Sequence, residues 1–371
     1  WVIDFLVLHV SVTVLLLQPT IDIPSHSFKM GNSSSYDKPA EVESKYFPDF
    51  VKSLPSLEGK TIAITGCTTG IGYICAKTCC ELGASVIMLN RPSTRANEAL
   101  QSLKDAGYKD VSMVECDLQS FESVKKASSE LQSKFKETGL DVLVNNAGIM
   151  ATVDEATGDG CDNQMQTNHL SHFLLTSGVW SLLETAHDKR GDARVVNQSS
   201  GARTQGNKKL EEKYVGKNGG NLGGDVGGWL PFTGPRWVRY QQTKLANVVF
   251  TYALRDRAEK AGSMVKSLCA HPGLTATNLQ VKSANDGGMG KAFTKWLMSF
   301  VSQSGEDGTM GLLSATAKSD VKSGDFFGPA STSGGLVGLM NTEEEEKLAD
   351  EESRDMLWKA STDVTGGKFP F

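Results

Sequence analysis

The hydrophobic pattern divides most of the chain into short apolar runs that alternate with longer stretches of helical spacing. Apolar runs without polar alternation are typical of parallel strands covered on both faces. They predict strands at 62–64, 84–89, 111–115, 142–144, 194–197 and 264–270, with a last strand end at 326–329, and helices at 70–83, 93–106, 121–136, 162–183, 239–260, 292–301 and 310–318. This alternation predicts one doubly wound α/β domain, a parallel sheet of about seven strands flanked by helices, with ligands at the carboxyl ends of the strands.

The first 48 residues do not continue this alternation, so we interpret 1–48 as an N-terminal tail and 49–371 as the single domain. The apolar run Phe5–Leu17 approaches the length of a signal-peptide core, but Asp4 stands where a basic flank is expected. Residues 30–35 match an N-myristoylation pattern if translation begins at Met30. The tail is therefore either a targeting segment or translated upstream sequence. Residues 44–56 are predicted to be a docking arm before the first strand.

Composition favours small-molecule partners. Of 371 residues, 39% are hydrophobic and 22% are charged, as in ordinary soluble proteins, and the net charge of -5 gives no reason to expect nucleic acid. The seven cysteines are odd in number and form no CxxC pair, so neither disulfides nor a metal site is expected. A reduced, cytoplasmic location follows, and the tail leaves peripheral membrane association or an organelle open. The acidic run at 343–346 is interpreted as a solvated helix start.

Three glycines follow the first strand at a spacing that suits a dinucleotide. Gly66, Gly70 and Gly72 let bare backbone approach a pyrophosphate and place the amides of the next helix against its charge. After the second strand, Arg91 stands where an acidic residue would bind ribose hydroxyls, and a basic residue there favours the 2'-phosphate of NADP. The alternative for Arg91 is a surface residue that begins the next helix. Asp117, after the third strand, can accept from an adenine amine, cap the following helix near Ser120, or do both.

Candidate proton-transfer residues lie on two predicted helices. Tyr240 and Lys244 are four positions apart, so they share a helix face. An ammonium group near a tyrosine favours the phenolate form, which suits acid–base chemistry, although the pair alone would also fit an ordinary exposed face. Asn168, with His169 and His172, lies in a helix that is apolar around most of its circumference. An amide there needs a reason, whereas the histidines are interpreted as core residues.

A polar, glycine-rich insertion spans residues 203–236. Its composition cannot build a core of its own, and a structureless loop of this length inside a domain is usually functional. Trp229, Phe232 and Trp237 supply large apolar surface at its distal end. We therefore predict a lid over a hydrophobic substrate, with a mobile surface loop or a partner-binding segment as the alternative.

Together these motifs resemble the short-chain dehydrogenase/reductase superfamily over about residues 57–366. The resemblance is carried by TGCTTGIG at 65–72, NNAG at 145–148, Asn168, Ser199 with Ser200, Tyr240 with Lys244, and PG at 272–273. The stretches NHLSHFLLT at 168–176 and KLAN at 244–247 are most similar to the retinol dehydrogenase and protochlorophyllide reductase branch. The resemblance implies a Rossmann fold with one NADP-binding catalytic domain.

The resemblance also implies a role for each matching residue. Tyr240 would be the acid/base. Lys244 would lower the pKa of Tyr240 and hold the nicotinamide ribose, while Asn168 would hold a water that relays protons to Lys244. Ser200 would bind the substrate oxygen, although one step along a strand reverses the face and leaves Ser199 open. The residues implied to contact NADP are Gly66, Thr69, Gly70, Ile71, Arg91, Asp117, Leu118, Asn145, Ala147, Gly148, Tyr240, Lys244, Pro272, Gly273 and Thr275.

Two features depart from the common pattern of the superfamily. Ser200 and Tyr240 are unusually far apart, which implies an unusual substrate side of the pocket. Thr69 stands where some NADP enzymes have a basic residue, so the NADP prediction depends on Arg91.

The predicted activity is NADP-dependent hydride transfer between nicotinamide and a carbonyl or alcohol of a bulky apolar molecule, such as a retinoid, a steroid or another lipid. A light-dependent protochlorophyllide reductase is one alternative, disfavoured because Leu245 and Ala246 stand where that family usually has a cysteine. A non-catalytic NADP-binding scaffold or sensor is the other. An oligomer is left open.

Overall fold

The computed structural model describes residues 38–226, 232–331 and 334–371. Residues 36–371 form one compact unit. The predictions on Phe5–Leu17, on residues 30–35 and on Trp229 lie outside the described residues. Within the described ranges, no helix has both the length and the apolar character that crossing a membrane requires.

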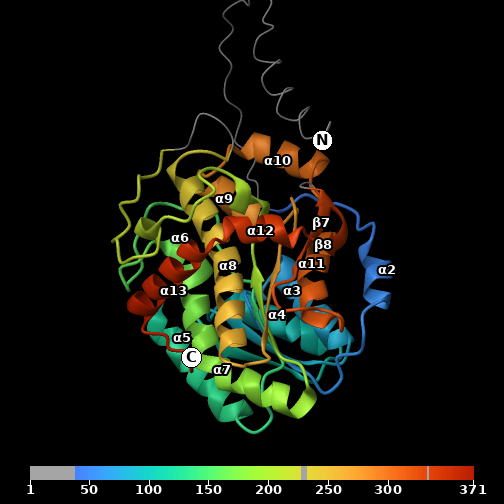
Figure 1. Cartoon of the computed structure of the whole chain (residues 1–371). Helices are drawn as coiled ribbons and strands as arrows, with labels where there is room; N and C mark the ends of the chain where they lie inside the picture. The colour runs from blue at the N-terminus through green and yellow to red at the C-terminus, as the bar shows by residue number, and fades with distance from the viewer. Residues whose placement is uncertain (1–37, 227–231, 332–333) are drawn as a thin grey trace, which may run out of the picture. The chain divides into compact units, whose positions relative to one another are not determined.

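An eight-stranded sheet lies at the centre of this unit, in the order β3-β2-β1-β4-β5-β6-β7-β8 (Figure 1). Its strands are β1 Thr61–Thr65, β2 Ser85–Asn90, β3 Val111–Glu115, β4 Val142–Asn145, β5 Arg194–Gln198, β6 Lys266–Ala270, β7 Phe326–Ser331 and β8 Gly334–Leu339. Neighbours from β3 to β7 pair in parallel, and β8 pairs antiparallel with β7. The doubly wound α/β class is confirmed. The edge strand β8 was not predicted, because its sequence GGLVGL carries glycines, which are depleted in strands.

Helices cover both faces of the sheet. The α-helices are α2 Phe47–Lys52, α3 Gly70–Glu81, α4 Thr94–Asp105, α5 Phe121–Phe135, α6 Asn163–Met165, α7 Ser171–Arg190, α8 Pro235–Lys260, α9 Asn278–Asn285, α10 Lys291–Phe300, α11 Gly305–Ala317, α12 Thr342–Leu348 and α13 Glu351–Thr365. A π-helix spans Gln166–Leu170, and 3-10 helices span Gly201–Thr204 and Glu212–Tyr214. The predicted helix over 162–183 is therefore interrupted, and α9 was not predicted.

Each face of the sheet has its own hydrophobic core. Successive residues of a strand point to opposite faces, so Ala63 packs in the core that α5, α7 and α8 cover, whereas Ile62 and Ile64 pack in the core under α3 and α11. All seven cysteines are free and buried, as small apolar residues would be. The strands are thus covered on both faces, and their carboxyl ends are the edge where side chains of several strands meet.

The docking arm before β1 is confirmed by its contacts with Asp307 near the start of α11. The Asp307 carboxylate accepts hydrogen bonds from Ser44 Oγ and from the backbone amides of Lys45, Tyr46 and Phe47, at 2.9–3.1 Å. Burial acts to raise the pKa of Asp307, but the four donors together outweigh it and lower that pKa below its ordinary value. One buried carboxylate therefore holds the arm against the domain.

Candidate active site

The glycine turn after β1 leads into the start of α3. Gly66 and Gly70 have φ values of 71° and 60°, in the left-handed region that favours glycine. A β-carbon on Gly72 would lie 2.3 Å from the Gly66 carbonyl oxygen, so the two backbone segments are in direct contact. Thr69, at the N-cap of α3, makes no side-chain capping hydrogen bond. Amides at such a helix start suit a pyrophosphate, so the residues fit the implied dinucleotide.

The end of β4 fastens the glycine turn. Asn146 Nδ2 donates to the carbonyl oxygens of Thr65 and Gly66, at 2.9 and 3.3 Å. The backbone amides of Asn146 and Ala147 both donate to Thr65 Oγ1 at 3.0 Å. Asn145 is buried, and its side-chain amide donates to side chains of α7 and β5. Through these hydrogen bonds, residues 145–147 at the end of β4 support the glycine turn.

The ends of β2 and β3 place Arg91 and Asp117 at one edge of the sheet. The register pairs the last residues of these two strands, and Arg91 is exposed just beyond β2. Asp117 Oδ1 accepts from the amide of Gln119 at 3.0 Å in a local turn, and Leu118 beside it is buried. The cap of α5 is Ser120, so the alternative of Asp117 as the helix cap is wrong.

Asn168 lies in the π-helix between α6 and α7 and is fully buried. Its Nδ2 donates to Thr243 Oγ1 on α8 at 2.8 Å. A β-carbon on Gly148 would lie 3.2 Å from Asn168 Oδ1 and 3.4 Å from Lys244 Nζ. The structure therefore brings Asn168, Gly148 and Lys244 together. Single π-turns are common at functional sites, since the wider turn redirects side chains.

Helix α8 carries Tyr240 and Lys244 against the end of β5. Both residues are buried, and Lys244 Nζ lies 5.8 Å from the centre of the Tyr240 ring. Lys244 Nζ donates to the Gln198 carbonyl oxygen at 3.1 Å. Ser199 Oγ donates to the Lys244 carbonyl oxygen at 2.8 Å, whereas the Ser200 side chain lies close enough to the Tyr240 phenol to counteract the rise of its pKa. Ser200 is thus the serine that faces the tyrosine.

Burial dominates the titration of this pair. It raises the pKa of Tyr240 to about 12, while the neighbouring Ser200 side chain acts in the opposite direction. It lowers the pKa of Lys244 to about 8. Both neutral forms are favoured because both charged forms lose water. The shift of the Tyr240 pKa is therefore upward, which differs from the expectation of a lysine-stabilised phenolate and leaves a phenol that can donate a proton.

The segment after β6 is tied down by its own side chains. Gly273 has a φ of 64°, and Thr275 Oγ1 donates to the Pro272 carbonyl oxygen at 2.7 Å. A β-carbon on Gly308 would lie 2.3 Å from Thr275 Oγ1, so α11 packs closely on this segment. Since β6 is the neighbour of β5, Pro272, Gly273 and Thr275 lie at the same edge of the sheet as Ser200.

The described part of the insertion is ordered by hydrogen bonds around a buried arginine. Asp154 Oδ2 accepts from the amides of Leu222 and Gly224 at 2.8 and 2.6 Å. Arg239 Nη1 donates to the Gly224 carbonyl oxygen at 3.0 Å, and its Nε lies 3.2 Å from an oxygen of Asp162. The expectation of a structureless loop is wrong for these residues.

The distal end of the insertion packs beside Tyr240. The rings of Phe232 and Trp237 meet edge to face at 4.9 Å between centroids, and Trp237 and Tyr240 do so at 5.9 Å. These rings belong to a third apolar cluster, separate from both sheet cores, whose buried members are Met150, Ala151, Ala202, Trp237, Tyr240 and Met289. The candidate site therefore has an apolar wall on one side.

The sequence did not reveal Arg203 and Glu345. Arg203 follows Ser200 by one turn and is buried, and it pairs with Glu345 of α12. The interpretation of 343–346 as a solvated run is wrong for Glu345, which is 5% exposed. A run of four glutamates carries no signal that singles out one member for burial.

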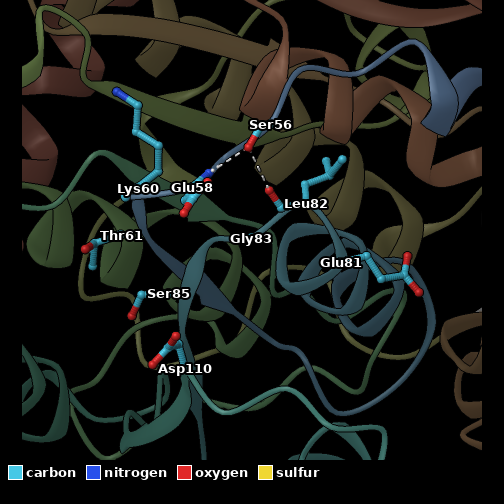
Figure 2. A pocket seen from close by; sticks show the side chains of 10 residues that line it. Ser56, Glu58, Lys60, Thr61, Glu81, Leu82, Gly83, Ser85 and Asp110 are labelled. Atoms are coloured by element: carbon cyan, nitrogen blue, oxygen red, sulfur yellow. Dashed lines mark hydrogen bonds between the residues drawn. The ribbon is translucent and has the colours of Figure 1, made fainter.

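A surface pocket of about 500 Å³ lies at the opposite edge of the sheet (Figure 2). Its lining includes Thr61 and Ser85, which begin β1 and β2, and Ser56, whose hydroxyl accepts from the Glu58 amide and donates to the Leu82 carbonyl oxygen. Because ligands of doubly wound sheets bind at the carboxyl ends of the strands, this pocket does not belong to the candidate site.

Known proteins are similar to this chain in sequence and in fold. The family model described as short chain dehydrogenase matches residues 60–213. The chain is 30% identical over 327 residues to short-chain dehydrogenase/reductase drtF of Aspergillus calidoustus, covering 83% of this chain and 94% of that protein. The chain belongs to the short-chain dehydrogenase/reductase superfamily. Members of this oxidoreductase superfamily use a nicotinamide cofactor.

Two further matches show what the chain is similar to in sequence and in fold. It is 35% identical over 237 residues to human retinol dehydrogenase 14, covering 60% of this chain and 64% of that protein. The predicted resemblance to retinol dehydrogenases is thereby confirmed. A solved structure from Mycobacterium paratuberculosis, titled a putative uncharacterized protein, matches with 28% identity and a TM-score of 0.64, covering 89% of this chain and 100% of that one. The chain spans less than two thirds of the length of several curated relatives.

Proposed function

We propose that this protein is an NADP-dependent oxidoreductase that interconverts a carbonyl and an alcohol on a bulky apolar substrate. The observation that carries the proposal is the buried Tyr240, which lies beside the Ser200 side chain and belongs to an apolar cluster. The nicotinamide, when bound, supplies or accepts the hydride. The protein would supply the proton and hold the reacting oxygen.

The proton chemistry follows from the environment of Tyr240. In reduction, the Tyr240 phenol would donate its proton to the substrate oxygen, and Ser200 would donate a hydrogen bond to the same oxygen. The pKa of Lys244, about 8, keeps the ammonium largely protonated at neutral pH. That charge would stabilise the phenolate left by proton donation. Asn168, beside Gly148 and Lys244, would hold the water that returns a proton.

The proposed cofactor site uses the carboxyl edge of the sheet. The glycine turn and the first amides of α3 would hold the pyrophosphate, and Arg91 would bind the 2'-phosphate that distinguishes NADP. The other residues proposed to contact NADP are Asp117, Leu118, Asn145, Ala147, Gly148, Tyr240, Lys244, Pro272, Gly273 and Thr275.

Substrate class is proposed from the wall beside Tyr240. Trp237, Met150 and Met289 present apolar surface near the phenol. Trp237 is fixed in place because its Nε1 donates to the Gly288 carbonyl oxygen at 2.9 Å. The similarity to retinol dehydrogenases supports an apolar alcohol or aldehyde, such as a retinoid, a steroid or another lipid.

The test compares Tyr240→Phe with Tyr252→Phe. Tyr252 lies on the same helix, is buried, and its hydroxyl has no hydrogen-bond partner among the described residues, so it is a matched control. Turnover is followed by absorbance of the reduced cofactor on a panel of ketones, aldehydes and alcohols. Tyr240→Phe is expected to reduce kcat by about 10²-fold or more, with unchanged NADPH affinity, and Tyr252→Phe to retain activity. Equal turnover in Tyr240→Phe would contradict the proposal.

A further inference from the structure

A buried ion pair lies next to the turn that carries Ser200. Arg203 Nε donates to Glu345 Oε2 at 2.8 Å, and Nη2 donates to Oε1. Only 4% of the Arg203 side chain and 7% of the Glu345 side chain are exposed. The two residues are far apart in sequence, since Arg203 lies on the 3-10 helix after β5 and Glu345 on α12. Two guanidinium nitrogens, Nε and Nη2, bond the two carboxylate oxygens, so Nη1 remains available for another hydrogen bond.

The third nitrogen of Arg203 reaches the backbone of Ser200. Arg203 Nη1 donates to the Ser200 carbonyl oxygen at 3.1 Å, and the Arg203 backbone amide donates to the same oxygen at 3.1 Å. Within that turn, the Ala202 amide donates to Ser200 Oγ at 3.2 Å. The orientation of the hydroxyl that meets Tyr240 is thus connected, bond by bond, to Glu345.

Among the described residues, Arg203 forms an ion pair with Glu345 and with no other carboxylate. Its guanidinium lies over the Phe326 ring at 4.6 Å, and the His271 ring meets the edge of Phe326 at 5.6 Å. Burial and the nearby Arg203 lower the pKa of His271 to about 3, so this imidazole is neutral at physiological pH. Glu345 therefore supplies the charge that balances Arg203.

An ion pair in such a place is hard to explain by stability alone. The free energy lost in taking both charges out of water often exceeds their mutual attraction, and well-packed apolar residues are frequently as stable. What an apolar pair cannot do is donate a hydrogen bond to the Ser200 carbonyl oxygen. The pair is best explained by the geometry that it imposes on this turn.

We propose that Arg203 and Glu345 are positioning residues that fix the Ser200 hydroxyl against Tyr240 and the substrate oxygen. This inference rests on the proposed function. Arg203 bonds the turn at Ser200 directly. Glu345 acts through Arg203 by fixing the orientation of its guanidinium. Helix α12 is therefore part of the support of the proposed site, although it lies far from Ser200 in the sequence.

The first test uses Arg203→Lys and Glu345→Gln, with Glu346→Gln as the matched control. Glu346 neighbours Glu345 on α12 but pairs with Arg255 at a more exposed position. We expect the first two variants to lose about 10-fold or more in kcat, since small misplacements of a reacting group are costly. The affinity for NADPH, measured by fluorescence titration, is expected to stay the same. Glu346→Gln is expected to match the wild type in both.

A second readout separates positioning from general damage. The Ser200 side chain lowers the Tyr240 pKa. Its displacement is therefore expected to move the ascending limb of the alcohol-oxidation pH profile, where Tyr240 must lose its proton to act as the base, to higher pH. This shift is expected in Arg203→Lys, in Glu345→Gln and in Ser200→Ala. It is not expected in Glu346→Gln.

The double variant Arg203→Met/Glu345→Leu covers the case in which a single variant fails to fold. Replacing both charges by apolar residues leaves no unpaired buried ion, so the double variant is expected to fold, as near-UV circular dichroism would report, yet to keep the kcat defect. Wild-type kcat and pH profile in the folded double variant would overturn the inference. A wild-type protein without NADPH-linked turnover would instead overturn the proposed function.

Discussion

Asn168 matches both backbone polar groups of Ile149 with one carboxamide. Its Oδ1 accepts from the Ile149 amide at 2.8 Å, and its Nδ2 donates to the Ile149 carbonyl oxygen at 2.9 Å. The π-helix is thereby joined to the segment that follows β4 and carries Gly148. An amide is required at this buried position because a carboxylate only accepts and an apolar side chain does neither. Asn168 thus joins two segments of the structure by hydrogen bonds, and it is also a proposed site residue.

Asn168→Asp is expected to destabilise the protein by about 1–3 kcal/mol. The substitution removes the donor to the Ile149 carbonyl oxygen and to Thr243 Oγ1, and an unsatisfied buried acceptor has a cost of that size. Urea denaturation measures the change. Asn97→Asp, at an exposed position of α4, is the control and should shift stability by less than about 0.5 kcal/mol. Equal stability of the two variants would show that the hydrogen bonds of Asn168 contribute little.

Lys244→Met is expected to be more stable than the wild type at pH 7 and inactive. Burial lowers the pKa of Lys244 from its ordinary value of 10.5 to about 8 in the folded protein, so the folded state binds this proton less tightly than the unfolded state. Removing the lysine therefore removes an unfavourable contribution of up to about 3 kcal/mol to the folding stability at pH 7. The Gln198 carbonyl oxygen keeps a partner, because Asn247 Nδ2 also donates to it at 2.9 Å.

The stability difference between Lys244→Met and the wild type is expected to decrease as the pH rises. Between pH 8 and 10.5 the unfolded state binds more protons, so wild-type stability rises with pH in that window. Urea denaturation at pH 7 and about pH 10 should show the gap between Lys244→Met and wild type closing toward the higher pH. A variant less stable than wild type at pH 7, or a gap independent of pH, would mean that the burial cost of Lys244 is small.

Gly72→Ala is expected to destabilise the protein and to prevent nucleotide binding. A β-carbon there would lie 2.3 Å from the Gly66 carbonyl oxygen and 2.4 Å from Asn146 Nδ2, so the glycine turn must move. Overpacking of this kind costs about 1–3 kcal/mol. Gly158→Ala is the control, since a β-carbon there meets no atom within 4 Å. Thermal unfolding and NADPH titration measure both effects, and a Gly72→Ala protein that binds NADPH normally would contradict the assignment of the turn.

Arg91→Gln is expected to weaken NADPH binding while leaving NADH binding unchanged. A charge-assisted hydrogen bond to a phosphate contributes about 1.5–3 kcal/mol, which corresponds to about a 10- to 100-fold change in affinity. Arg95→Gln, exposed on α4, is the control. Kd values for both nucleotides give the ratio directly. An unchanged preference in Arg91→Gln would return Arg91 to the alternative of a surface residue.

The sequence by itself determined the layout of the fold and the sheet edge at which the candidate site residues meet. Apolar runs without alternation marked the parallel strands, because burial on both faces removes the need for polar positions. The glycine turn and the asparagine motif stood at the ends of such runs, so their meeting at one sheet edge followed from topology. The four-residue spacing of Tyr240 and Lys244 fixed their common face for the same local reason.

Only the tertiary structure decided which polar groups are buried and what they meet. Ser199 and Ser200 are indistinguishable in sequence, and the packing of α8 on β5 gives one to the Lys244 carbonyl and the other to Tyr240. Local spacing likewise gives no sign that Arg203 and Glu345 are buried. Each is the ion-pair partner of the other, and the two lie far apart in the sequence. Burial of a charge depends on its partner in space, and that partner is absent from any local pattern.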